Sequence, residues 1–119
     1  MPTKKPASEE SRCDAMVKQV GGLVVQFGRK GLRTKNTQGI PDRLYFIQGK
    51  MIYFEVKSAN DYLSEAQVTF LINVLAYNGI AGCGNRDDLA VLLNAPNRLQ
   101  VGTTQITKYS TRQKALRGA

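Results

Sequence analysis

Apolar and polar positions recur along the chain with two different periods, and these periods predict its helices and strands. Near the start, four apolar side chains recur at the spacing of one helix face: Cys13, Met16, Val17 and Val20. This spacing predicts a short amphipathic helix over residues 9–20, with Ser8 as its N-cap and two glycines after it as its end. Residues 1–8, rich in proline and lysine, are expected to form a disordered lead-in.

The next segments are typical of β-strands. Residues 23–27 are β-branched and apolar, and the runs 43–48 and 51–57 are rich in aromatic and β-branched residues. Because Gly49 and Lys50 separate these two runs, they predict a β-hairpin with a two-residue loop, in which residue 48 faces residue 51. Both faces of the hairpin are largely apolar, so we expect a central pair of strands covered on both sides.

A second helix is predicted by its N-terminal signal. Ser64 and Gln67 have the spacing of a capping box, and an apolar run follows them up to Asn78 and Gly79. Gln67 lies at the N-terminal end of the buried helix face, towards which side chains tilt. It is therefore expected either to face the strand ends or to serve only as the capping partner of Ser64.

The remaining elements are short. Residues 80–84 predict a buried strand and residues 86–93 a helix, whereas residues 94–119 are a polar, basic tail with a possible strand near 100–107. The resulting order is helix, three strands, helix, strand, helix. We therefore expect an α/β domain over residues 9–93, with a small mixed sheet flanked by helices.

Composition narrows the classes of function. The 119 residues include 17 Lys and Arg but 9 Asp and Glu, which gives a net charge of +8 and favours a polyanionic partner. Residues 28–35 and 94–119 carry bases without a single acid, whereas residues 36–93 have four bases and six acids. Either the acids of the middle segment hold a cation close to bound phosphates, or surface charges are simply distributed unevenly.

Some classes are excluded. The chain has no histidine, so triads with an imidazole base and His-ligated zinc are ruled out. Two cysteines, 70 residues apart, form neither a zinc cluster nor a disulfide framework. No apolar run approaches the length of a membrane span, so we expect a soluble, cytoplasmic protein that does not bind membranes.

Three charged residues carry the candidate chemistry. In the expected register Asp42 lies opposite Lys57 and Glu55 lies opposite Leu44, so that all three charges share one face at one end of the hairpin. Such a cluster costs solvation free energy. Oxygen ligands at this spacing suit Mg²⁺, and a lysine beside them could position water or stabilise negative charge. The alternative is an ion pair of purely structural importance.

These residues also carry a family resemblance. Pro41 and Asp42 match the first half of the PD-(D/E)xK nuclease signature, and the Glu55-Val56-Lys57 tripeptide matches the second half. The whole arrangement of G-x-PD, hairpin, E-V-K and an L-S-x-x-Q helix resembles the VRR-NUC branch of that superfamily, over about residues 9–93. The resemblance implies a restriction-endonuclease-like αβββαβ core.

The resemblance also implies roles for individual residues. Asp42, Glu55 and the Val56 carbonyl would ligate Mg²⁺ or Mn²⁺, with Glu10 contributing directly or through water, although Glu9 is an alternative. Lys57 would be the catalytic lysine, and Gln67 matches the glutamine that the family carries on the next helix.

DNA binding is expected of the segment before the PD element. Its four bases would contact backbone phosphates without reading sequence: Arg29, Lys30, Arg33 and Lys35. With the resemblance, this predicts a stand-alone, homodimeric, Mg²⁺- or Mn²⁺-dependent DNA endonuclease that acts on branched DNA such as Holliday (four-way) junctions, in a bacterium or a phage-infected host cell. The alternatives are a non-catalytic nucleic-acid-binding module of the same fold and an unrelated small RNA-binding protein.

Overall fold

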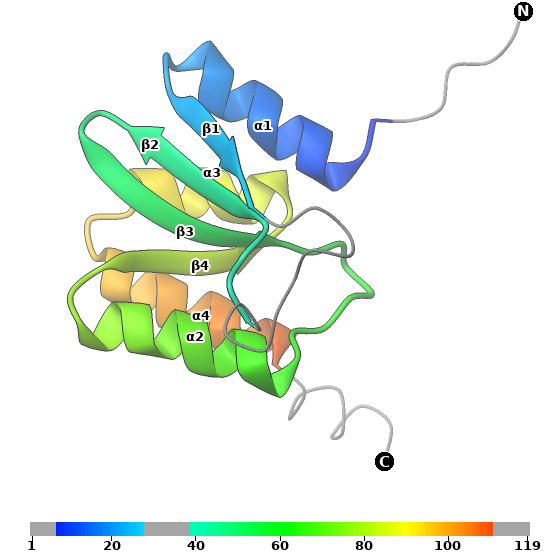
Figure 1. Cartoon of the computed structure of the whole chain (residues 1–119), viewed down its shortest axis with the longest axis vertical. Helices are drawn as coiled ribbons and strands as arrows, with labels where there is room; N and C mark the ends of the chain where they lie inside the picture. Colours follow the sequence, from blue (N-terminus) through cyan, green and yellow to red (C-terminus); the bar gives the residue numbers. More distant parts are fainter. Residues whose placement is uncertain (1–6, 28–38, 111–119) are drawn as a thin grey trace, which may run out of the picture.

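The helices and strands follow the predicted order, with one additional helix at the C-terminal end (Figure 1). The computed structural model describes residues 7–27 and 39–110. In chain order the elements are α1 Glu9–Gln19, β1 Leu23–Gln26, β2 Arg43–Ile47, β3 Lys50–Val56, α2 Glu65–Ala76, β4 Ile80–Gly84, α3 Arg86–Asn94 and α4 Arg98–Tyr109. The αβββαβ order expected from the sequence is therefore confirmed.

The four strands form one mixed sheet in the order β1-β2-β3-β4. β1 pairs with β2, and β2 with β3, in antiparallel fashion, whereas β3 and β4 are parallel. Parallel neighbours require a crossover, which α2 supplies between β3 and β4. The small mixed sheet flanked by helices is thus confirmed.

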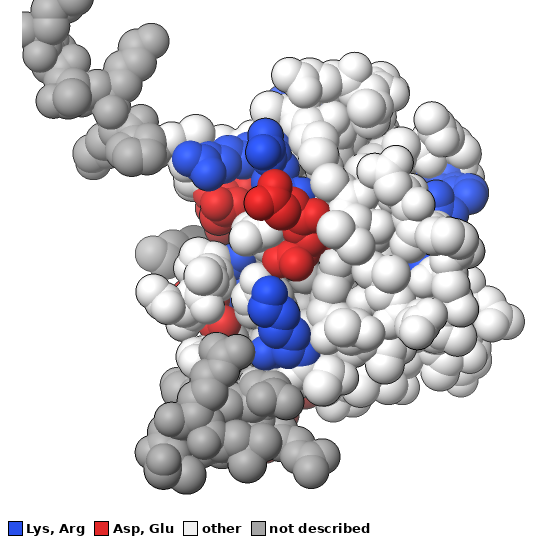
Figure 2. Space-filling model, turned by 180° about the vertical axis from the view of Figure 1, so that it is seen from behind, with Lys and Arg blue, Asp and Glu red and all other residues white. Residues whose placement is uncertain are grey.

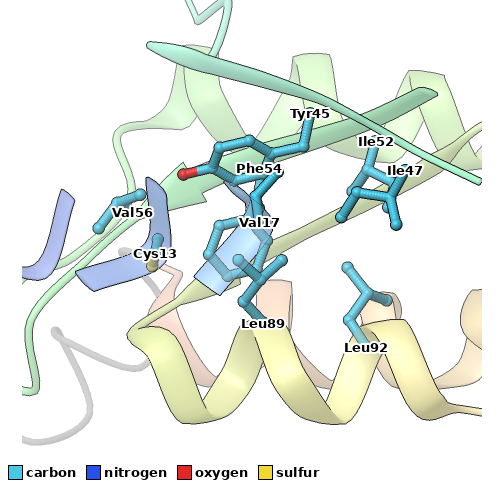
Figure 3. Packing of buried hydrophobic residues seen from close by; sticks show 9 residues of the cluster. All are labelled: Cys13, Val17, Tyr45, Ile47, Ile52, Phe54, Val56, Leu89 and Leu92. Carbon is cyan, nitrogen blue, oxygen red and sulfur yellow. The ribbon is translucent and has the colours of Figure 1, made fainter. Parts of the chain in front are cut away.

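Two hydrophobic cores lie on opposite faces of the sheet. On one face, α1 and α3 pack against β2 and β3, and Figure 3 shows the side chains that meet there: Cys13, Val17, Tyr45, Ile47, Ile52, Phe54, Val56, Leu89 and Leu92. On the other face, α2 and α4 lie over β4, and their core consists of Leu63, Leu71, Leu75, Ala81, Cys83, Ile106 and Tyr109. The second core therefore depends on α4, which lies beyond residue 94.

The expectation that the hairpin is covered on both faces is wrong near its turn. Ile47 and Ile52, which face α1 and α3, are buried. Phe46 and Met51 point to the opposite face, and they are 38% and 44% exposed. Apolar side chains on both faces make a strand suitable for burial, but they do not determine where the covering helices lie. On this face the helices lie over β4 and not over the part of the hairpin near its turn.

The hairpin turn also differs from the expected one. Its two central residues are Gln48 and Gly49, because Ile47 pairs with Lys50. Both central residues have positive φ, 51° and 77°, as the turns that match the twist of a hairpin require. The sequence favoured a loop of Gly49 and Lys50 because glutamine is an unusual residue for positive φ.

The strand expected near residues 100–107 is wrong, because residues 98–109 form helix α4. The side chain of Asn97 caps this helix by accepting a hydrogen bond from the backbone N–H of Gln100. Gly102 lies so close to the Ala81 carbonyl of β4 that a Cβ atom there would collide with it. The close packing of α4 on β4 therefore requires glycine at this position.

None of the helices in the described residues combines the length and the apolar character needed to cross a membrane.

Candidate active site

The predicted acids and lysine gather at one end of the sheet, where β2 begins and β3 ends. Asp42 directly precedes β2, Glu55 is the last residue but one of β3, and Lys57 directly follows β3. Extended by one residue, the observed register pairs Asp42 with Glu55. The expected pairings of Asp42 with Lys57 and of Glu55 with Leu44 are therefore wrong. Because the register shifts by two residues, all three side chains remain on the same face of the sheet.

Glu55 is the most deeply buried charge of this group. Its residue is 5% exposed, and the ammonium nitrogen of Lys57 lies 3.9 Å from its Oε1. Asp42 is half-buried, and its Oδ1 is shielded from solvent, as is Oε2 of Glu55. Withdrawing such charges from water costs several kcal/mol for each ion before their mutual attraction offsets part of it. The cluster therefore needs a compensating gain, either in stability or in function.

Gln67 is a direct neighbour of Glu55. Its Nε2 donates a hydrogen bond of 3.1 Å to Glu55 Oε1, while its Oε1 accepts one of 2.8 Å from the backbone N–H of Ser64. Ser64 in turn accepts from the backbone N–H of Gln67, which completes the capping box of α2. Gln67 is therefore not only a capping partner: one amide group caps α2 and also donates to the buried acid.

The backbone that carries these side chains is fixed on its far side by β4. The N–H of Lys57 donates a hydrogen bond of 2.8 Å to the carbonyl of Gly84, and the side chain of Val56 is buried in the core beneath α1 and α3. Glu55 and Lys57 therefore face away from that core, as alternation along a strand requires.

The acids of α1 are placed differently. Glu10 is exposed, whereas Glu9 is half-buried, pairs with Arg12 at 3.5 Å and accepts a hydrogen bond from the backbone N–H of Arg86. Across residues 7–27 and 39–110, no three acidic or cysteine side chains lie close enough together to form a metal-binding group. Neither Glu9 nor Glu10 therefore joins Asp42 and Glu55 in this conformation.

The donor atoms nevertheless suit a divalent cation. Asp42 and Glu55 offer carboxylate oxygens from neighbouring strand ends, with a shielded oxygen on each. Mg²⁺ is commonly bound by one or two carboxylates, with water and substrate phosphate oxygens as its other ligands. The residues present therefore fit Mg²⁺ or Mn²⁺, and the sequence has no histidine nitrogen that could bind zinc.

One group on the opposite face of the sheet, beneath α1, escaped the sequence analysis. The Asp14 carboxylate of α1 accepts hydrogen bonds from Arg43 Nε at 3.0 Å and from the Tyr45 hydroxyl at 2.9 Å. Burial, together with the bond to Asp14, raises the pKa of Tyr45 far above its usual value. Arg43 is 8% exposed and directly follows Asp42, so this group ties α1 to the strand that carries the first acid. No local pattern reveals a pair that is 29 residues apart.

The charges of the described surface are unevenly arranged. Figure 2 shows a group of acidic side chains bordered by basic ones on the face seen from behind, while much of that face carries no charge. The bases expected to hold DNA phosphates lie outside the described residues: Arg29, Lys30, Arg33 and Lys35.

The order of helices and strands, with one mixed sheet, agrees with the αβββαβ core that the resemblance implied. Among solved structures, the chain is similar to one described as a VRR_NUC domain, with a TM-score of 0.58 and 20% sequence identity. The match covers 75% of this chain and 94% of that one. The chain therefore has the fold of a VRR_NUC domain. No protein-family model and no curated protein matches the sequence.

Proposed function

We propose that the chain is a divalent-metal-dependent DNA endonuclease of the VRR-NUC type. The observation that carries the proposal is the meeting of Glu55 with Lys57 and Gln67, beside Asp42, on a fold shared with a VRR_NUC domain. A structural ion pair alone would need neither a second carboxylate at the facing position nor an amide donor from a separate helix.

Each residue has a distinct task in this proposal. Asp42, Glu55 and the Val56 carbonyl hold Mg²⁺ or Mn²⁺, and Gln67 keeps the Glu55 carboxylate oriented through its 3.1 Å hydrogen bond. Glu10 contributes through water once DNA is bound. Lys57, whose ammonium nitrogen lies 3.9 Å from Glu55 Oε1, would orient the attacking water and stabilise the negative charge that develops on the phosphate.

The cation supplies polarisation of the scissile phosphodiester and a lower pKa for bound water. The chain's own contribution is placement: two strand ends and one helix N-terminus fix the donors before DNA arrives. Such preorganisation is a large part of what catalysis of phosphoryl transfer requires. With no histidine in the sequence, Lys57 would act beside the bound cation where other nucleases use an imidazole base.

The substrate follows from charge and resemblance. The net charge of +8 favours DNA, and the bases Arg29, Lys30, Arg33 and Lys35 directly precede the PD element in the sequence. We infer a homodimer that cuts branched DNA such as four-way junctions, because a two-fold pair of sites matches two strands to be cut.

Metal binding tests the proposal independently of any choice of DNA. Mn²⁺ is titrated into wild type and Asp42→Asn, with Asp87→Asn as a control, since the Asp87 side chain is 84% exposed. The proposal predicts binding that is lost in Asp42→Asn, retained in the control, and accompanied by unchanged circular dichroism. Equal binding by all three proteins would show that Asp42 does not bind the metal and that the charge cluster has a structural role. It would favour a non-catalytic nucleic-acid-binding module.

A further inference from the structure

The sheet exposes a band of large apolar side chains on the face that α2 and α4 cover only over β4. Leu23 is 61% exposed, Phe46 38% and Met51 44%, and Tyr77 at the end of α2 is 88% exposed. Soluble proteins rarely leave contiguous apolar areas of this kind without an interaction partner. We name these residues, with two that join them, the apolar band: Leu23, Phe46, Met51, Tyr53, Phe70 and Tyr77.

Strand pairing makes the band continuous. Leu23 of β1 pairs with Phe46 of β2, and Phe46 pairs with Met51 of β3. Tyr53 lies two residues along β3 and therefore on the same face. Its ring meets that of Phe70 edge-on, with 5.6 Å between centroids, and this contact links the strands to α2.

The apolar band combines projecting side chains with a hollow. A shallow hollow of about 400 Å³ lies between β3 and α2, and its lining includes Tyr53, Phe70 and Tyr77. The side chains of Phe46 and Met51 project from the strands next to Tyr53. In a two-fold pair, the same patch faces itself, so the projecting residues of one copy can enter the hollow of the other.

Charge favours a second copy over a nucleic acid. None of the residues that line the hollow is charged, although the chain as a whole carries +8. DNA binding draws on Lys and Arg contacts to phosphates, which the band does not supply. Two copies of a basic protein repel each other, and an uncharged surface is where they approach at the lowest electrostatic cost.

The area of the band is large enough for the central, apolar part of such a contact. With about 200 Å² for a fully exposed side chain of this size, the exposed parts of Leu23, Met51 and Tyr77 supply roughly 400 Å² per copy. That is about half of the ~800 Å² that each partner contributes to a standard interface. A polar rim around the band can supply the remainder, as in most interfaces.

We propose that the apolar band is the surface through which two copies of this chain form a two-fold dimer. The inference rests on the homodimer of the proposed function and names its surface. The interface is formed by β1, β2, β3 and the outer side of α2. The strand β4 takes no part, since α2 and α4 cover it.

The test compares two leucines of nearly equal exposure, 61% for Leu23 in the band and 58% for Leu99 on α4. The masses of wild type, Leu23→Glu, Tyr77→Glu and Leu99→Glu are measured by light scattering over a range of concentrations. We expect wild type and Leu99→Glu at twice the chain mass of 13.1 kDa. The two band variants should be monomers with unchanged circular dichroism, and their dimer dissociation constants should rise by at least about 100-fold, since each substitution acts twice.

Other outcomes overturn the inference. Wild type that is monomeric at every concentration shows that the band does not join two copies of the chain. If Leu23→Glu and Tyr77→Glu form dimers with the same dissociation constant as wild type, the interface lies elsewhere on the chain. Failure of the proposed function would give a different set of results. Wild type would then form a dimer that Leu23→Glu disrupts, but it would bind no Mn²⁺ at Asp42.

Discussion

Replacing Gln67 by glutamate separates its two roles in one substitution. A glutamate keeps the carboxyl oxygen that accepts from the Ser64 N–H, since Glu is as good a capping-box residue as Gln. It replaces the amide that donates to Glu55 with a second carboxylate about 3 Å from the first. The helix cap therefore survives, while the contact with the buried acid turns from attraction into repulsion.

The distance sets the size of the effect. Two unit charges about 3 Å apart repel by roughly 5 kcal/mol at an effective dielectric constant of about 20, and screening at the half-buried Gln67 position reduces this to about 2–3 kcal/mol. Loss of the hydrogen bond to charged Glu55 adds about 1.5–3 kcal/mol. We therefore expect Gln67→Glu to lower the free energy of unfolding by about 4–6 kcal/mol at pH 7.

The effect should depend on pH. Repulsion raises the pKa of the carboxylate pair in the folded state above the value near 4.3 of the unfolded chain. The loss of stability is therefore absent below about pH 4 and grows as the pH rises through the raised pKa. A divalent cation that binds between the carboxylates should restore part of the stability, and more in Gln67→Glu than in wild type.

Urea unfolding from pH 4 to pH 8, with and without Mg²⁺, measures these changes. Thr69→Glu is the matched control, because it adds the same charge to an exposed position of the same helix. If Gln67→Glu is as stable as Thr69→Glu at pH 7, and the difference does not vary with pH, the contact between Gln67 and Glu55 does not exist in solution.

Three further predictions concern the surroundings of the site. Arg43→Met leaves the Asp14 carboxylate without its buried partner, and urea unfolding should show a loss of about 2–4 kcal/mol. Tyr109→Phe removes the hydroxyl that donates to Asp88 at 2.9 Å between α4 and α3, and it should lower the free energy of unfolding by about 1 kcal/mol; an unchanged value would show that the hydroxyl is solvated. Because burial raises the pKa of Cys13 to about 12, its thiol should resist alkylation at pH 8 until the protein unfolds. The same shift lowers stability as the pH rises above about 8.5, since only the unfolded chain then loses the proton.

Local patterns predicted most of the fold. The capping box at Ser64 and Gln67 located the start of α2 to the residue, because the signal lies in side chains three positions apart. The hairpin faces were also correct, since alternation by two survives a shift of the register by two. The register itself was missed because Gln48, and not only Gly49, adopts positive φ in the turn.

The C-terminal helix escaped prediction for a different reason. Its sequence contains several β-branched threonines, which lowers helix propensity. Within the helix, three threonine hydroxyls donate hydrogen bonds to backbone carbonyls one turn earlier: Thr103, Thr104 and Thr107. Packing of Ile106 and Tyr109 in the second core outweighs the weak local preference, and such tertiary stabilisation is not visible in a short window of sequence.

The candidate site also has a part that the sequence predicts and a part that only the fold reveals. Asp42, Glu55 and Lys57 were found because strands fix the spacing of their side chains, and the structure places all three at one end of the sheet. The bond between Asp14 and Arg43 joins two segments whose relative position only the fold determines. The metal-binding and catalytic roles of these residues stay predictions.

Cleavage of DNA by wild type and Lys57→Ala tests the central claim most directly. Both proteins, at matched concentration, are incubated with labelled four-way junction, flap, linear duplex and single-stranded DNA, in Mg²⁺, Mn²⁺ or EDTA. The account predicts cleavage by wild type alone, dependent on the metal and strongest on the junction, with symmetric cuts in opposing strands. Binding of all four DNAs by both proteins without cleavage by either would contradict it, and the charge cluster of Asp42, Glu55 and Lys57 would then be structural.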